Sequence, residues 1–218
     1  MRAVLPARPA ALLAIAAVLL LSAACAPARP AEQPAASLPA GWATYTSRQC
    51  EFSISYPPGM QVANESPYSR MLEFPQAASD AGVRNFIYVS AIGPQVQSMV
   101  SLGTYQNEVY NYDPAATGIL LGMQVGESKS VHPVASMASG FTYARKADRA
   151  LGGASARTYE NAQPWEFPPG TKEIRHILSL DGCTYLVGGY VDTTGSARPG
   201  AISEELFDQV VATLRVLP

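Results

Sequence analysis

The sequence has few of the residues from which catalytic and metal sites are usually built. Its 218 residues include only two histidines, His132 and His176, and three cysteines. Because a zinc or copper site needs several converging nitrogen or sulfur donors, we expect no metal site. The patterns G-x-S-x-G, G-x-G-x-x-G and G-x-x-x-x-G-K are absent, so a nucleophile elbow and a phosphate-binding loop have no support. We therefore predict neither a catalytic residue nor a cofactor.

Positive charge is also scarce. Fifteen Lys and Arg residues stand against 17 Asp and Glu, which gives a net charge of −2. Proteins that bind nucleic acid usually carry a basic patch or stripe, whereas this chain as a whole is acidic. We therefore expect no nucleic-acid partner, and the composition gives no polybasic attraction to anionic lipid.

The longest apolar run lies at the N-terminus. Arg2 and Arg8 precede the apolar segment Ala10–Leu21, and small residues follow it at positions 22–24. A positive start, an apolar centre and small residues together predict a secretory signal peptide. The run up to position 24 is shorter than the about 20 residues that a membrane-spanning helix needs. A permanent transmembrane anchor is therefore the weaker interpretation.

Cys25 follows the signal directly. The segment Leu21-Ser22-Ala23-Ala24-Cys25 resembles the lipobox of bacterial lipoproteins, with its leucine one position earlier than is usual. The resemblance implies a signal peptide over residues 1–24, and a thioether-linked diacylglycerol on Cys25, usually with a further acyl chain such as palmitate. Two or more acyl chains hold a protein stably on a bilayer. The protein would then be membrane-bound in the cell envelope, on the outer side of the cytoplasmic membrane or on the outer membrane. Plain secretion is the alternative.

Residues 25–41 form the predicted tether. After the cysteine this segment reads APARPAEQPAASLPAG, which has almost no large apolar side chains and cannot pack into a core. Its prolines favour extended polyproline geometry with a reach of up to about 50 Å. Loss of the signal would leave 13 basic and 17 acidic residues, a net charge of −4. The remaining residues, 42–218, are numerous enough for one domain with its own core.

Several segments of this domain have the pattern of β-strands. Apolar and polar residues alternate from Cys50 to Tyr56, which predicts a half-buried strand. Residues 85–92 are apolar at nearly every position, as expected for a central strand. Residues 140–147 and 153–162 are predicted strands joined by a turn.

The segment 172–191 contains the strongest turn signal. Asp181-Gly182 suits the two central positions of a type I′ turn, which require positive φ. The turn would join two antiparallel strands in one register. Because the paired side chains are mostly apolar, we expect their face of the hairpin to be the buried one. The predicted pairs are Leu180 with Cys183, Leu178 with Tyr185, and His176 with Val187.

Two regions are predicted to be helical. The first covers residues 105–112 and, after Asp113-Pro114, residues 115–123. The second covers residues 202–218, with Ser203 as its N-cap. Strands in meanders, with the helices gathered on one side of the sheet, predict an α+β domain. The second helix has an apolar stripe of Leu206, Phe207, Val210, Val211 and Leu214.

Four short motifs lie within residues 42–216: Y-T-S followed by F-S-I-S-Y-P-P-G-M, then G-G-A-S-A-R-T-Y, D-G-C-T-Y-L and F-D-Q-V-V-A-T-L-R. Together they resemble the PsbP-like family, relatives of the extrinsic subunit of photosystem II. The resemblance implies an antiparallel sheet flanked by helices. The tryptophan that often follows Y-P in that family is Met60 here, and no photosystem- or metal-binding residue of the subunit can be matched. The resemblance therefore implies fold and location but no chemistry.

Cys50 and Cys183 both project from the predicted buried faces of their strands. In the oxidising compartment that an export signal implies, two such thiols are expected to pair. The disulfide would close a long loop and contribute about 5 kcal/mol by chain entropy. The alternative is two separate buried thiols that behave as small hydrophobes.

Trp165 and Phe167 mark a possible binding loop. They lie in the proline-rich segment 160–171, between two predicted strands. Exposed aromatic side chains on a rigid loop suit recognition, and the alternative is that both rings pack on the edge of the core. His176 is predicted to be a core histidine with its hydrogen bonds satisfied inside the sheet, rather than a metal ligand.

The function that we expect from the sequence is non-enzymatic. We expect a lipid-anchored extracytoplasmic domain that binds an envelope partner or supports a larger assembly. The predicted anchor, the tether and the lack of catalytic motifs all favour this role. The alternative is a carrier that holds an apolar ligand in a cavity between sheet and helices. A hydrolase is the least favoured function, because it would need His132 or His176 beside both a hydroxyl and a carboxylate.

Overall fold

The computed structural model describes residues 38–47, 50–63, 69–74, 85–94, 114–131, 141–162, 164, 167, 169–195 and 200–217. The chain divides into two units, Met1–Ala31 and Glu32–Pro218, and every described residue belongs to the second. The predicted signal, Cys25, most of the tether, His132, Trp165 and the predicted helix at 105–112 lie outside the described residues. Neither helix of the described segments is long and apolar enough to span a membrane.

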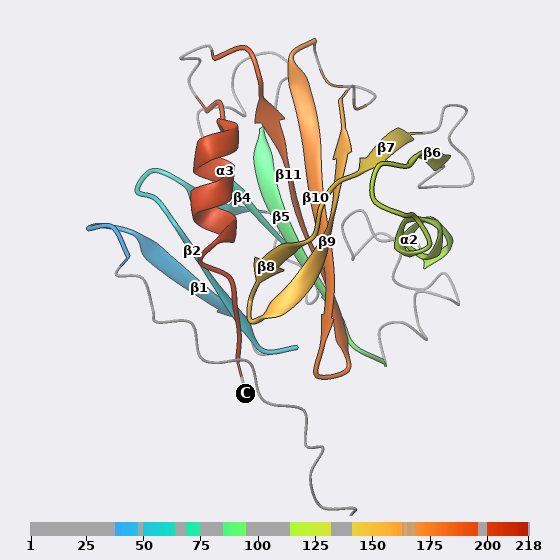
Figure 1. The fold of residues 1–218 in the computed structure, drawn as a ribbon. Coiled ribbons are helices and arrows are strands. Elements are labelled where there is room, and N and C mark those ends of the chain that lie inside the picture. The colour runs from blue at the N-terminus through green and yellow to red at the C-terminus, as the bar shows by residue number, and fades with distance from the viewer. Residues whose placement is uncertain are drawn as a thin grey trace, which may run out of the picture. The chain divides into compact units, whose positions relative to one another are not determined.

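Two antiparallel sheets and two helices make up the described part of the chain (Figure 1). The small sheet has the order β1-β2-β12, and the large sheet has the order β3-β4-β5-β11-β10-β9-β7-β6, with β8 paired to β9. The bounds are β1 Ala43–Ser47, β2 Phe52–Tyr56, β3 Gln61–Ala63, β4 Ser69–Glu73, β5 Phe86–Ile92, α2 Pro114–Leu121, β6 Ser128–Val131, β7 Phe141–Arg145, β8 Arg149–Leu151, β9 Ala154–Asn161, β10 Thr171–Leu180, β11 Cys183–Asp192, α3 Glu204–Val211 and β12 Arg215–Val216.

The hairpin of β10 and β11 confirms the predicted turn and register. Asp181 and Gly182 have φ values of +50° and +78°, as a type I′ turn requires. The three predicted pairs are all present, including His176 opposite Val187. The prediction that only their face would be buried is wrong, because the opposite face of β10 is buried as well.

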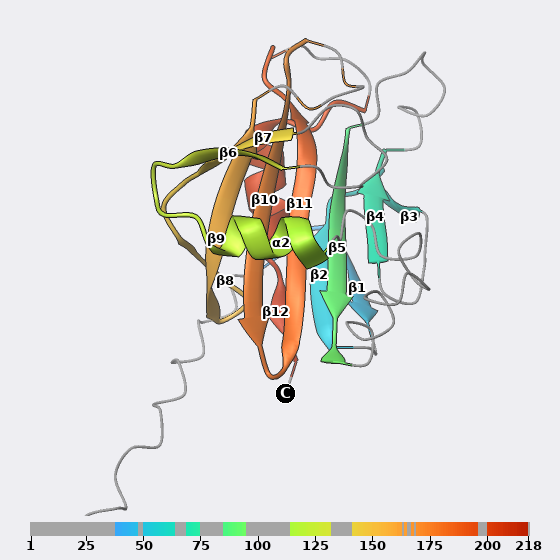
Figure 2. The same cartoon turned by 90° about the vertical axis from the view of Figure 1, so that its right-hand side faces the viewer.

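The two faces of the large sheet are covered by different elements (Figures 1 and 2). α3 and the small sheet lie against one face, and α2 crosses the other. The expectation that both helices gather on one side is therefore wrong. The central strands explain why: every residue of β5 is buried, so both of its faces need a cover.

The core on the α3 side joins both sheets to the helix. Alternate residues of the central strands face α3, because side chains in a strand point to opposite faces. This core includes Phe52, Ile54, Leu72, Ile87, Val89, Leu178, Tyr185, Val187, Phe207, Val210, Val211 and Leu214.

Helix α3 is shorter than the predicted helix over 202–218. Ser203 caps it as predicted, since its side chain accepts a hydrogen bond from the Leu206 amide (3.1 Å), and the helix ends at Val211. Leu214 is buried beyond the helix end. The following residues pair with β2 as β12, because the edge of β2 offers backbone partners that a longer helix would leave unpaired.

Two further predictions need correction. β2 starts at Phe52, and Cys50 lies in the turn before it with a φ of +45°. Between the strands predicted at 140–147 and 153–162, the structure has the additional strand β8 rather than a simple turn. The described residues hold twelve strands and two helices of eight residues. The predicted α+β class is therefore confirmed only in part: the antiparallel sheet is flanked by helices, but helix is the minor component.

Candidate functional site

Glu173 and Arg175 lie two residues apart on β10, so both side chains project from the face that α2 crosses. Their exposed fractions are 0% and 2%. A buried charge costs several kcal/mol unless it is paired and hydrogen-bonded. The groups around this pair therefore determine whether the centre of the sheet is stable.

Two tyrosines from other strands complete the arrangement, and we call Tyr88, Tyr143, Glu173 and Arg175 the polar cluster. Tyr88 Oη donates to Glu173 Oε1 (2.9 Å), and Tyr143 Oη donates to Glu173 Oε2 (2.7 Å). Arg175 donates from Nη2 to Glu173 Oε1 (2.7 Å) and from Nε to Tyr88 Oη (3.0 Å). Each carboxylate oxygen thus accepts a hydrogen bond from a tyrosine inside the protein.

The electrostatics of the polar cluster follow from its burial. Burial raises the pKa of Tyr88 and of Tyr143 well above the usual value; the Arg175 cation opposes this, and the Glu173 carboxylate adds to it. Burial also disfavours the charge of Arg175, but the Glu173 carboxylate, together with the neighbouring tyrosine oxygens, holds the pKa of Arg175 well above its usual range. Both tyrosines are therefore neutral donors at physiological pH, and the arginine is a cation. None of these three groups titrates near pH 7.

Two adjacent glycines of β11 position a ring on each face of the large sheet. A Cβ at Gly188 would overlap the Tyr88 hydroxyl and lie 2.7 Å from the Ile174 carbonyl oxygen. A Cβ at Gly189 would lie 2.9 Å from the Phe207 ring. Gly188 therefore allows Tyr88 to reach across β11 to the polar cluster, and Gly189 allows α3 to pack closely on the opposite face.

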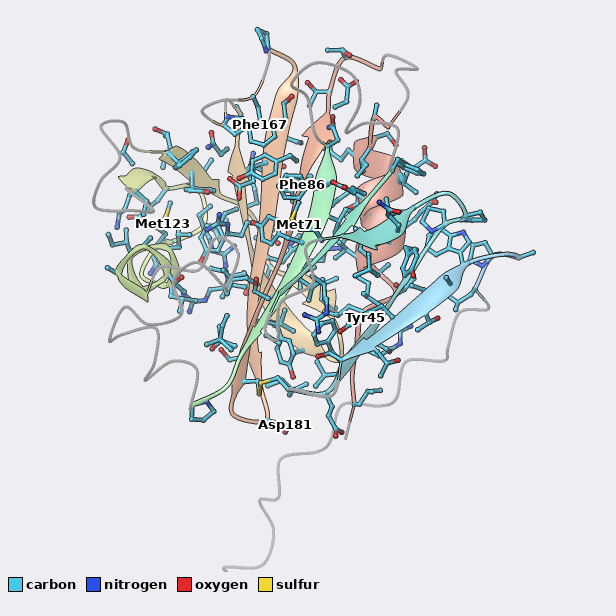
Figure 3. The ribbon with its side chains drawn as sticks, turned by 180° about the vertical axis from the view of Figure 1, so that it is seen from behind. Tyr45, Met71, Phe86, Met123, Phe167 and Asp181 are labelled. Atoms are coloured by element: carbon cyan, nitrogen blue, oxygen red, sulfur yellow. A yellow bond between two sulfur atoms is a disulfide. The ribbon has the colours of Figure 1, made fainter. Side chains whose placement is uncertain are left out.

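Aromatic rings pack beside the polar cluster. Phe167 stacks on Tyr190 with ring centres 4.0 Å apart and planes within 5° of parallel. Phe86 lies 5.0 Å from Tyr190 between ring centres, and Figure 3 shows Phe86 and Phe167 close together. Phe167, half of the possible binding loop, thus packs half-buried on the edge of the core. Trp165, the other half, lies outside the described residues.

Helix α2 is fixed to the sheet through its last carbonyl groups. Tyr159 Oη donates to the Leu120 carbonyl oxygen (2.7 Å), and the Arg157 guanidinium donates to that of Leu121. The last carbonyls of a helix lack the partners that its interior carbonyls have. These two β9 side chains therefore hold the end of α2 against the sheet, and the Leu120 carbonyl also accepts from the Met123 amide (3.0 Å). The inward-facing residues of this segment are Ala116, Leu120 and Met123.

Three large apolar side chains are exposed on α2 and the loop after it, two of them on either flank of the buried stripe of the helix. Ile119 is 46% exposed, Leu121 is 36% exposed and Val125 is 64% exposed; we call these three residues the α2 surface. No charged residue occurs from position 114 to position 125. Full burial of one such side chain stabilises a protein by about 1.5–3 kcal/mol. Covering the exposed halves of all three would therefore contribute roughly a further 2–4 kcal/mol. A helix that is apolar all round is normally covered on all sides.

Charged groups border the α2 surface. Arg157 and Lys129 are both exposed, and Lys129 lies 3.7 Å from the Glu127 carboxylate. The same carboxylate accepts a hydrogen bond from the Gln124 amide (2.7 Å). The acidic group at this border is therefore engaged by a cation and an amide, and Arg157, Lys129 and Glu127 together leave one net positive charge beside the apolar surface.

His176 lies on the other face of β10, against Phe207. It is 1% exposed, its ring centre is 5.8 Å from that of Phe207, and its Nδ1 shares a hydrogen bond with Thr158 Oγ1 (3.0 Å). Its Nε2 has no hydrogen-bond partner. Burial, with the nearby charge of Arg149, lowers the pKa of His176 to about 3. His176 is therefore a neutral core histidine, as expected, although only one of its nitrogens is satisfied.

Cys50 and Cys183 form the disulfide that the sequence predicts, with Cα atoms 6.0 Å apart. The bond joins the turn before β2 to the first residue of β11, which lies beside the turn residue Asp181 labelled in Figure 3. It therefore ties the small sheet to the large one. Within the described segments, no three His, Cys, Asp or Glu side chains gather as a metal site would require.

The polar cluster is the part of this face that the sequence analysis missed. Glu173 and Arg175 alternate with apolar residues, a pattern typical of a strand with one solvated face. The signal that could have revealed it is Gly188-Gly189, because glycine inside a strand often marks a close approach of another group. Nothing in the sequence, however, indicates that Tyr88 and Tyr143 are the partners.

Comparison with known proteins gives similarities to solved structures, among them the three that follow. No protein-family model and no curated protein matches the sequence. A structure from Bacteroides thetaiotaomicron VPI-5482 is 15% identical over 80% of this chain, with a TM-score of 0.38. The chain spans 48% of that protein's length, about half.

The other two similarities are to named proteins. Cyanobacterial PsbP (CyanoP) from Synechocystis sp. PCC 6803 is 12% identical, with 86% of this chain and 99% of that chain covered and a TM-score of 0.42. LpqN, described as involved in cell envelope biogenesis of Mycobacterium tuberculosis, is 10% identical, with 77% and 83% covered and a TM-score of 0.31. A PsbP protein is thus among the structures to which this chain is similar. Because every TM-score lies below 0.5, we draw no argument from these similarities.

Proposed function

We propose that this chain is a lipid-anchored, extracytoplasmic bacterial protein with a PsbP-like domain that acts by binding or by supporting a larger assembly, and not by catalysis. Cys25 would carry the lipid, residues 25–41 would form the tether, and the cell envelope would be its location. The lipobox-like segment and the proline-rich composition after it support the anchor and the tether.

The observation that carries the binding role is the α2 surface. Ile119, Leu121 and Val125 fall within seven positions of one segment, whereas exposed apolar residues on monomers are usually scattered. The only other large apolar side chain exposed among the described residues is Leu38. A rigidly held apolar helix at the surface is suited to contact with a partner rather than with water.

The remaining chemistry of the described residues favours a non-enzymatic role. The tyrosines of the polar cluster are neutral donors to Glu173, so their hydroxyls are occupied by the sheet itself. His176 contacts a hydroxyl but is sealed beneath Phe207 with a pKa of about 3. A general base that works near neutral pH would need a higher pKa and access to substrate.

The packing under α3 favours binding over the carrier alternative. A carrier would need a cavity between sheet and helix, but a Cβ at Gly189 would already lie 2.9 Å from the Phe207 ring. Phe207, Val210 and Val211 are fully buried against the sheet. The interface between α3 and β11 thus lacks space for a methyl group at its centre.

Photo-crosslinking in native membranes tests the binding role. A photoreactive amino acid replaces Leu121 in the full chain, and in a matched control it replaces Gln209, which is exposed on α3. We expect a discrete adduct from position 121 that is absent from position 209 and is lost when Ile119→Ser and Val125→Ser are added. Equal capture at both positions, or a substrate turned over by the domain and abolished by one side-chain change, would contradict the proposal.

A further inference from the structure

We propose that the α2 surface rests on the outer face of the bilayer to which the chain is tethered. This inference deepens the proposed function and rests on it, because the lipid on Cys25 is what brings the domain to the membrane. The occupant of the surface is then a lipid surface, with acyl chains below and phosphate groups at the rim.

The predicted tether is long enough for α2 to reach the bilayer. It extends up to about 50 Å, and a domain of this size has a radius of gyration of about 16 Å and thus a diameter of about 40 Å. The tether therefore leaves the domain free to turn any face toward the membrane. A second contact is needed to fix its orientation.

The shape and composition of the α2 surface suit the interface of a bilayer. Helices that lie on membranes bury an apolar side in the boundary between headgroups and acyl chains. Ile119 and Leu121 project from α2, and Val125, the most exposed of the three, lies in the loop after it. Because no charged residue occurs between positions 114 and 125, the segment can enter this boundary without taking a charge with it.

The border of the α2 surface carries positively charged side chains, which lipid phosphates attract. Arg157 and Lys129 are exposed at this border, and the Glu127 carboxylate is already held by Lys129 at 3.7 Å. Arginine and lysine beside an inserted apolar group can reach the phosphate level while their stems stay in the apolar region. With Glu127 counted, these groups leave one net positive charge beside an uncharged centre, which complements the phosphate and acyl layers of a lipid surface.

The opposite side of the domain has the reverse character. α3 exposes Glu205, and its Glu204 and Asp208 form ion pairs with Lys172 and Arg149. None of the large apolar side chains exposed among the described residues lies on α3. Three acidic groups against these two cations leave one net negative charge at α3, whereas the border of the α2 surface has one net positive charge. Anionic phosphates therefore favour α2 toward the membrane and α3 away from it.

Fluorescence quenching in vesicles tests this orientation. The full mature chain with its lipid is reconstituted into vesicles of phosphatidylethanolamine and phosphatidylglycerol. An environment-sensitive fluorophore is attached at Val125→Cys or, as the matched control, at Gln209→Cys. Quenching is measured with aqueous iodide and with lipids that carry a nitroxide on the acyl chain.

The inference predicts that iodide quenches the label at position 125 about threefold less than the label at position 209, and that nitroxide lipids quench only position 125. Adding Ile119→Ser and Leu121→Ser should abolish both differences while the far-UV circular dichroism spectrum stays that of the parent. Because both side chains are partly buried, some loss of thermal stability is expected as well. Equal access of iodide to both labels would overturn the inference. Shielding of position 125 in native membranes but not in vesicles would also overturn it, because the occupant would then be a protein.

The intact mass of the same preparation separates this inference from the proposed function. If Cys25 carries acyl chains and position 125 remains open to iodide, the inference alone is wrong. If Cys25 carries none, the lipid anchor is wrong. The labelled chain mixed with the same vesicles then still tests the α2 surface, where shielding of position 125 supports contact with lipid and full access of iodide overturns it.

Discussion

Gly188 lies in the middle of β11, where the Tyr88 ring crosses the strand to reach Glu173 and Arg175. A side chain at this position would compete directly with the tyrosine hydroxyl. The polar cluster therefore depends on a residue that makes no hydrogen bond within it. The missing Cβ leaves the space through which a side chain of β5 contacts two side chains of β10 across β11.

Gly188→Ala should lower the free energy of unfolding by about 1–3 kcal/mol, because the added methyl group overpacks a buried site. Chemical denaturation measures the change. Gly118→Ala is the matched control: Gly118 is in α2, a Cβ there meets nothing within 4 Å, and the change should stabilise the chain by up to about 1 kcal/mol. A Gly188→Ala variant as stable as the parent would show that Tyr88 does not need this space.

His176 should make the domain sensitive to mild acid. Its pKa falls from 6.5 to about 3 on folding, so its contribution to stability is present above pH 6.5 and is lost as the pH falls toward 3. Between pH 7 and pH 5 the loss should be about 2 kcal/mol. His176→Gln should remove this dependence, as unfolding at the two pH values will show. A variant that keeps the full dependence would assign it to other groups.

The elements differ in how far the sequence determines them. The hairpin of β10 and β11 could be predicted to the residue, because Asp181-Gly182 fixes both turn type and register. The end of α3 could not, since the apolar stripe continues to Leu214 and only the free edge of β2 ends the helix. Long-range pairing of this kind leaves no local signal.

The candidate site, too, could be predicted only as far as local sequence signals reach. The sequence predicts α2 itself from Asp113-Pro114 and the apolar run after it. How much of this helix stays exposed depends on the strands that lie beneath it. Tyr159 and Arg157 of β9, which donate hydrogen bonds to its last carbonyl groups, are 36 or more positions away in the sequence. The burial of Glu173 likewise depends on a cover over the second face of the sheet.

The disulfide links the two sheets, so its removal should affect the stability of the whole domain. Cys50 and Cys183 are 133 positions apart, and closing such a loop is worth about 5 kcal/mol by chain entropy. We expect the double variant Cys50→Ser, Cys183→Ser to lose up to about that amount in chemical denaturation. A reducing agent should lower the parent to the level of the variant and leave the variant unchanged. No effect of reduction on the parent would mean that the two thiols are unpaired.

If the proposed signal is lost, the remaining chain has a net charge of −4, whereas the α2 surface is uncharged with one net positive charge at its border. Net negative charge on both partners opposes contact between the domain and an anionic membrane. The proposed acyl chains would offset that repulsion, and a local surface of the opposite character would reduce it for one face of the domain. In the arrangement that we propose, the acyl chains would hold the chain at the bilayer and the α2 surface would orient it.

The mass of the mature protein extracted from membranes tests the lipid anchor most directly. We predict a chain that starts at Cys25 and carries the mass of a diacylglycerol, with or without a further acyl chain. Treatment that cleaves ester-linked acyl chains should remove most of the added mass and leave the thioether-linked glycerol on the cysteine. A mature chain of unmodified mass, or one that retains residues 1–24, would contradict the proposal that lipid at this cysteine holds the domain in the envelope.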